Sequence, residues 1–198
     1  MRYCCGGLVL LFGLCILSVG CAREETAPLA QMEFRVDSTL LGAVIEVPNH
    51  DLRFNPPVGW ASISDSGVVQ VNEEAPGEEG AITVEAAHLF FHPTHRSVLS
   101  VSVLRQVAGG RFEERIAAYA EVLKDAFPGP ELKQTAFRKD GLHIVQFLAR
   151  PEGLVNFKIV LDTPSADLIQ FDYVVPQPFY EEQVRAIESS IGSIQPLD

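Results

Sequence analysis

Three short turns in the second half of the chain constrain the fold more strongly than any other feature of the sequence. Each turn contains glycine or proline and adjoins an apolar segment with strand character. The turns are Asp140-Gly141, Pro151-Glu152-Gly153 and Pro164-Ser165-Ala166-Asp167, and the strands that follow them are 142–149, 155–161 and 168–175. Strands joined by so few residues pair antiparallel, because a parallel crossover takes a dozen or more residues. The chain is therefore predicted to build an antiparallel sheet.

The rest of the chain predicts further strands and two helices. The additional strands are expected at 41–47, 52–54, 68–71, 82–91, 98–104 and 132–138. Apolar residues recur at helical spacing from Phe112 to Phe127, where Pro128-Gly129-Pro130 ends the helix. A second helix is expected from about Pro178 to the buried stripe that ends at Ile194. These elements indicate one α+β domain, with helices packed against the sheet.

The first 21 residues have the layout of an export signal. Arg2 is followed by an apolar run from Leu8 to Leu17, and small residues then precede Cys21. The run is shorter than the ~20 residues that cross a bilayer, which favours a secretory signal peptide over a membrane span. With cysteine at the cleavage junction, the segment resembles a bacterial lipoprotein signal, which implies that Cys21 is lipidated and becomes the first mature residue. The alternatives are an uncleaved anchor helix and a secretory signal cut at another small residue.

This signal divides the chain into three parts. Residues 1–20 are the predicted lipoprotein signal peptide, 21–40 the lipidated cysteine with a flexible tether, and 41–198 the globular domain. A flexible tether of ~20 residues has a reach of roughly 25 Å. The alternative for its second half is an extra strand over 32–39. The other three cysteines lie inside the signal, so the mature chain can form no intramolecular disulfide.

The charge of the chain limits its partners. The formal net charge is −11, and the mature chain is more acidic because Arg2 leaves with the signal. No basic stripe is present to meet phosphates, which argues against nucleic-acid binding. Anionic headgroups repel such a surface, so contact with the lipid bilayer is expected only through acylated Cys21. We expect the domain on the periplasmic or extracellular side of a cell membrane or outer membrane, and Ala22 after the cysteine favours the outer membrane.

The sequence contains no recognisable catalytic set. It lacks Gly-x-Ser-x-Gly, His-Glu-x-x-His, a phosphate-binding loop and a dinucleotide fingerprint. We therefore expect no enzymatic activity and no cofactor.

A histidine cluster is the nearest approach to a metal site. His88, His92 and His95, with Glu85 nearby, are residues of a type that binds zinc or copper. Residues four apart on a strand lie about 13 Å from each other, so only His92 and His95 are expected to come close, across a turn. Ordinary strand and loop histidines are the simpler interpretation, and no metal is expected.

Two groups of acidic residues have equally simple interpretations. The loop Glu73–Glu79 offers carboxylates for calcium but lacks the ligand spacing of a calcium loop, so a solvated loop is favoured. Asp167 and Asp172 could form a carboxylate pair, but a turn cap and a solvent-facing strand residue fit their positions better.

Four aromatic residues are candidates for a binding surface. Tyr173, Phe179 and Tyr180 gather where the last strand meets the last helix, and Trp60 is the only tryptophan. They could line a groove for a partner segment or an apolar ligand, because tryptophan and tyrosine are enriched in binding hot spots. The alternative is that they seal the helix onto the sheet and cap its end, since aromatic residues dominate core packing.

Two segments carry a family resemblance. Phe54-Asn55-Pro56-Pro57-Val58-Gly59-Trp60 follows a strand, and the closing helix over 184–193 ends in serines. This arrangement resembles the PsbP-like family, whose superfamily includes DcrB-like envelope lipoproteins and a nuclear-transport factor that binds the GTPase Ran. The resemblance covers about 42–195. It implies an α/β/α sandwich with a central antiparallel sheet flanked by helices, and protein binding rather than catalysis.

These observations lead to one expected function and two alternatives. The expected function is a membrane-anchored lipoprotein whose PsbP-like domain binds an envelope protein or helps a complex assemble. The first alternative is a carrier or sensor of a small apolar ligand, held between sheet and helix. The second is a hydrolase with a non-standard site, which needs converging carboxylates or histidines.

Overall fold

The computed structural model describes residues 33–47, 49–74, 82–127, 132–163 and 167–197. The strands are β1 (Ile45–Val47), β2 (Leu52–Phe54), β3 (Ala61–Ser62), β4 (Thr83–Phe91), β5 (Val98–Arg105), β6 (Lys133–Lys139), β7 (Leu142–Ala149), β8 (Leu154–Asp162), β9 (Leu168–Pro176) and β10 (Gln195–Pro196). The α-helices are α1 (Asp65–Glu74), α2 (Phe112–Ala126) and α3 (Tyr180–Gly192), and the 3₁₀ helices are η1 (Ser38–Leu40) and η2 (Gln177–Phe179). None of the described helices is long and apolar enough to cross a membrane.

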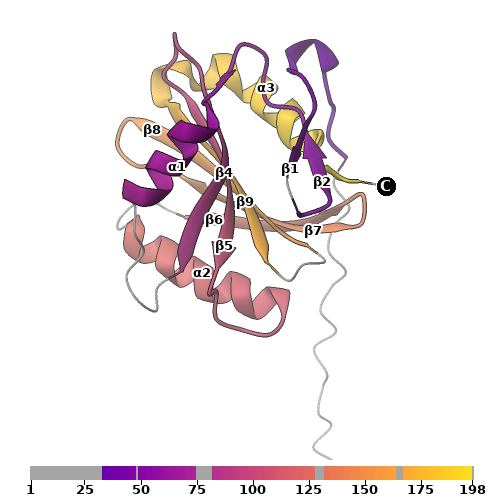
Figure 1. Cartoon of the computed structure of the whole chain (residues 1–198), viewed down its shortest axis with the longest axis vertical. Coiled ribbons are helices and arrows are strands. Elements are labelled where there is room, and N and C mark those ends of the chain that lie inside the picture. Colours follow the sequence, from indigo (N-terminus) through magenta and orange to yellow (C-terminus); the bar gives the residue numbers. More distant parts are fainter. Residues whose placement is uncertain (1–32, 48, 75–81, 128–131, 164–166, 198) are drawn as a thin grey trace, which may run out of the picture.

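Helices cover both faces of a large antiparallel sheet (Figure 1). In the described part of the chain its strand order is β3-β4-β5-β9-β8-β7-β6, and a small sheet, β1-β2-β10, lies beside it. Ile187 and Ile191 of α3 pack on one face, in a cluster that also contains the small sheet. Ile116 and Leu123 of α2 pack on the other. The predicted α+β sandwich is confirmed.

Alternation along the central strands explains why both faces are covered. In β8, Ile159 belongs to the apolar cluster under α3, and the next residue, Val160, belongs to the cluster under α2. Successive side chains of a strand point to opposite faces, so an unbroken apolar run needs a cover on each side. The helices α2 and α3 provide these two covers.

The hairpin predicted at Asp140-Gly141 is formed. Both residues have positive φ, 48° and 81°, as a two-residue type I′ turn requires. The pairs β6–β7, β7–β8 and β8–β9 are all antiparallel. The prediction drawn from the three turns is therefore confirmed.

The strand predicted over 68–71 is wrong, because these residues lie in α1. The valines there favour a strand by propensity, but tertiary contacts decide. Residues four apart share one helix face, and Val68 packs with Leu89 while Asn72 exchanges two hydrogen bonds with the backbone of Ala86. The pairing of β4 with β5 shifts register at Ala86. The helix therefore places Asn72 where it can bond the backbone of β4 at the point where the pairing of that strand is irregular.

The segment from Phe34 to η1 packs on the domain. Phe34 contacts the core and lies 5.6 Å, centroid to centroid, from Phe137, while the Asp37 backbone N–H donates to Ser189 Oγ at 3.2 Å. The part assigned to the tether from residue 34 onward is therefore held against α3. No strand forms over the described residues 33–39, so that alternative is wrong there. The signal, Cys21 and the rest of the tether lie outside the described residues.

Gly192 permits this close packing. A Cβ at Gly192 would lie 2.6 Å from Phe34 Cβ and 2.7 Å from Val36 Cγ2. We expect Gly192→Ala to lower the free energy of unfolding by about 1–3 kcal/mol, because overpacking displaces the segment. Urea denaturation of the full chain measures this loss, and trypsin should cut faster after the exposed Arg35.

Gly110→Ala is the matched control for this substitution. Its Cβ would meet only Glu114 Oε2, at an ordinary 3.8 Å. Equal stability and equal cleavage of the two variants would contradict the proposed packing of the segment on α3.

Candidate functional site

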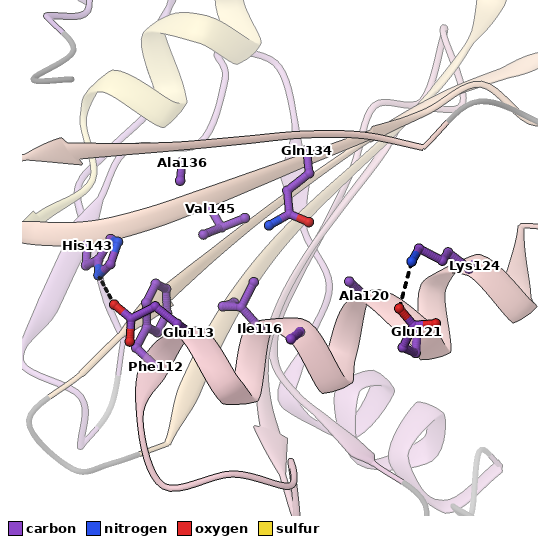
Figure 2. Close-up of a pocket in the computed structure, with 11 residues that line it drawn as sticks. Phe112, Glu113, Ile116, Ala120, Glu121, Lys124, Gln134, Ala136, His143 and Val145 are labelled. Carbon is purple, nitrogen blue, oxygen red and sulfur yellow. Dashed lines mark hydrogen bonds and ion pairs between the residues drawn. The ribbon is translucent and has the colours of Figure 1, made fainter. Parts of the chain in front are cut away.

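An apolar pocket lies between α2 and the two strands at one end of the sheet, β6 and β7 (Figure 2). Its volume is about 350 Å³, within the usual range of ligand pockets. The lining residues are Phe112, Glu113, Ile116, Ala117, Ala120, Glu121 and Lys124 of α2, Gln134 and Ala136 of β6, and His143 and Val145 of β7. Sequence reasoning did not single out this pocket.

Small side chains create the space. Ala117 and Ala120 on α2 and Ala136 on β6 all line the pocket, and their methyl groups leave volume that a larger residue would fill. Phe112 and Ile116 are buried and attach the first half of the helix to the sheet. The pocket is therefore a gap in a well-anchored interface between helix and sheet.

The start of α2 is fixed by its own first turn. Glu114 accepts backbone N–H groups from Gly110 and Arg111, at 3.0 and 3.2 Å, and pairs with the Arg111 side chain. These hydrogen bonds lower the pKa of Glu114 to about 2, and the bond from the Gly110 N–H is the largest cause. A carboxylate that stays ionised keeps this helix end, and with it one wall of the pocket, in place.

Charged groups stand at the two ends of the pocket (Figure 2). At one end, His143 Nδ1 lies 3.8 Å from Glu113 Oε1, and burial lowers the pKa of His143. At the other end, Lys124 Nζ lies 2.6 Å from Glu121 Oε1. Neutral His143 can accept or donate a hydrogen bond, so the two ends can orient a ligand whose centre is apolar.

The pocket lining combines apolar side chains with a few ionisable groups. Among the described residues that line the pocket, none has a hydroxyl or a thiol. The histidine–carboxylate pair therefore has no hydroxyl or thiol among these lining residues to activate. The arrangement can hold an apolar group between polar ends, which is binding chemistry.

Two of the four predicted histidine-cluster residues come together. The rings of His92 and His95 are stacked 4.2 Å apart, across the turn as expected. His88 Nε2 instead contacts the carbonyl of Glu46 at 3.1 Å, and Glu85 pairs with Arg105. In the described residues no group of three metal-ligating side chains converges.

A chain of hydrogen bonds fixes His95 beside α3. The Trp60 indole N–H donates to Gln183 Oε1 at 3.2 Å, so the other end of this amide, Nε2, donates to His95 Nδ1 at 2.8 Å. The second ring nitrogen of His95 lies 3.4 Å from Glu182. Neutral His95 therefore carries its proton on Nε2, toward Glu182.

Of the four aromatic residues predicted to form a binding surface, two are buried in the core and two are partly exposed. Trp60 and Tyr173 are only 6% and 0% exposed and pack against each other at 6.3 Å. Phe179 stacks on His95 at 4.7 Å, and Tyr180 stacks on Phe157 at 5.9 Å. Tyr180 also lines an open hollow beside η2.

The predicted acidic candidates do not converge either. Asp167 lies 3.5 Å from Arg105, whereas Asp172 pairs with Lys158 in the middle of the sheet. The expectation that Asp172 faces solvent is wrong: its side chain is 17% exposed, and burial raises its pKa. Of the loop predicted over Glu73–Glu79, residues 73 and 74 lie in α1 instead, and 75–79 lie outside the described residues.

Comparisons with known proteins concern the fold alone. No protein-family model matches the sequence, and no curated protein is significantly similar to it. Among solved structures, the chain resembles the solution structure of cyanobacterial PsbP (CyanoP) from Synechocystis sp. PCC 6803, with a TM-score of 0.53. The likeness covers 78% of this chain and 91% of that one, at 17% identity. The chain therefore has a PsbP-like fold.

The lowered pKa values of two histidines predict how the stability of the folded chain depends on pH. Burial, and for His92 also the neighbouring His95, lowers the pKa of His92 and of His143. The unfolded chain takes up these protons near pH 6.5 while the folded chain does not, so acidification favours unfolding. We expect thermal stability to fall as the pH drops from about 7 to 5.

The double variant His92→Asn/His143→Asn should depend less on pH over the same range. Differential scanning calorimetry at several pH values measures both proteins. An unchanged pH dependence in the double variant would show that other groups are responsible.

Proposed function

We propose that this chain is a lipid-anchored, non-enzymatic protein-binding domain of the cell envelope. It docks a partner protein, or helps a complex assemble, through the pocket between α2, β6 and β7. The open apolar pocket beside the end of the sheet is the observation that carries this proposal. The lining supplies binding groups, and the candidate catalytic residues lie apart.

The first 21 residues support the proposed anchor. Cys21 is the one cysteine that would remain after signal removal, and the layout before it resembles a lipoprotein signal. The whole chain has a formal net charge of −11, so a domain of this acidic chain has no net electrostatic attraction to anionic headgroups. Acyl chains on Cys21 would therefore supply the membrane affinity.

Carriage of a small apolar ligand is a second candidate function. The pocket has an apolar centre and polar groups at its ends, which is the usual composition of a small-molecule site. Native mass spectrometry of the full chain distinguishes the two functions. A retained lipid or metabolite that Ala117→Phe displaces would favour carriage.

The proposed lipid anchor is tested by replacing the sulfur atom of Cys21. Cys21→Ser removes the proposed lipidated sulfur, so we expect loss of labelling by an alkyne fatty acid and release of the domain from the membrane fraction. Cys15→Ser, inside the proposed signal, should keep both. Labelled, membrane-bound Cys21→Ser protein would contradict the lipid anchor.

The docking site is tested by photo-crosslinking in the cells that make the protein. A benzophenone amino acid at Ala117, which is exposed and lines the pocket, should give one defined crosslinked protein. The same probe at Val122, which is 45% exposed on α2 but outside the pocket, should not. Identical products from both positions, or none from Ala117, would contradict docking at the pocket.

A further inference from the structure

We propose that the partner contributes an extended segment, with an apolar residue between acidic ones, which adds as a strand to β6 and inserts its apolar side chain into the pocket. This inference rests on the proposed function and names the partner's chemistry and binding mode. Three features of the described residues support it: the open edge of β6, the position of the pocket, and the cations on the strand.

The edge of β6 can accept another strand. β6 is the last strand of the described sheet and pairs over its 7 residues with β7 only. Its outer edge therefore presents backbone groups that an added strand can bond. The opposite edge is less suitable, because β3 has 2 residues and α1 packs on the neighbouring β4.

The pocket lies where an added strand would place its side chains. Gln134 and Ala136 of β6 point toward α2 and line the pocket, while the next residue, Phe137, is buried on the α3 side. A strand added about 4.8 Å beyond β6 would alternate in the same way. Its residue on the α2 side would then lie next to Ala136 and Ala117. One apolar side chain can thus enter the pocket while the backbone extends the sheet.

The charges on β6 favour an acidic segment. Lys133 and Arg138, near the two ends of the strand, are exposed cations in a chain whose net charge is −11. Charges more than about 8 Å apart are largely screened at physiological ionic strength, so an edge-bound strand senses these nearby cations first. Acidic residues on both sides of the apolar residue complement them.

The same cations argue against a second copy of this chain. Two β6 strands paired edge to edge would bring four exposed cations together, which disfavours the pair. The charge pattern therefore selects a different, acidic partner.

Synthetic peptides of 7 residues, the length of β6, test the binding mode with the full chain. The probe carries glutamate at both ends and branched apolar residues at alternate positions between them. Fluorescence anisotropy should show saturable binding that weakens with salt, and a peptide with lysine at both ends should bind more weakly. Methylation of one alternate set of peptide amides should abolish binding, whereas methylation of the other set should not, because only one set faces β6.

Variants of the protein separate the contributions of charge and pocket. Arg138→Glu should weaken binding of the acidic peptide at least about fivefold, whereas Arg96→Glu, the same change on the exposed turn after β4, should not. Ala117→Phe should abolish binding by filling the pocket, and Val122→Phe should leave it intact.

The outcomes distinguish this inference from the proposed function. Equal effects of the two methylation sets, or tighter binding of the lysine peptide, would overturn strand addition by an acidic segment. If Ala117 still crosslinked a defined protein, docking at the pocket would stand. A crosslink to a second copy of the chain would overturn the inference. A crosslinked peptide with the acid–apolar–acid pattern would support it.

Discussion

Burial of both faces of the central strands is the constraint on which the rest of the structure depends. β8 and β9 present apolar side chains in both directions, so each face of the sheet must be covered. α3 and the small sheet cover one face, and α2 covers the other (Figure 1). The pocket exists because small residues face each other where α2 passes over β6: Ala117 and Ala120 on the helix and Ala136 on the strand. The architecture and the candidate site thus have one origin.

Polar groups inside the sandwich add specificity to this packing. Lys158 and Asp172 pair across β8 and β9, and Tyr119 of α2 donates a hydrogen bond to Gln170 of β9. Breaking a buried pair by removing one partner costs about 3–5 kcal/mol, so such pairs penalise any shift of register. On the other side, Tyr173 hydrogen-bonds Ser190 of α3. Both helices are therefore positioned by polar bonds as well as by apolar area.

The candidate site was only partly predictable. The sequence predicts the helix from Phe112 and a strand over 132–138, and both elements form. It does not show that this strand is the last of the sheet, or that His143 lies beside Glu113, because neither follows from local spacing. The sequence instead favours four aromatic residues as a binding surface, but two of them, Trp60 and Tyr173, belong to the core. An aromatic side chain has the same appearance in sequence whether it is buried or exposed.

The sequence by itself determined the antiparallel sheet, the helices α2 and α3, and the absence of a disulfide framework after residue 21. These properties depend on local signals: turn residues such as Asp140-Gly141, helical or alternating periodicity, and the positions of cysteines. Only the tertiary structure decided that 68–71 is helical, that Phe34 packs on α3, and that a pocket opens beside β6. Each of these depends on residues distant in sequence, whose contacts outweigh local propensity.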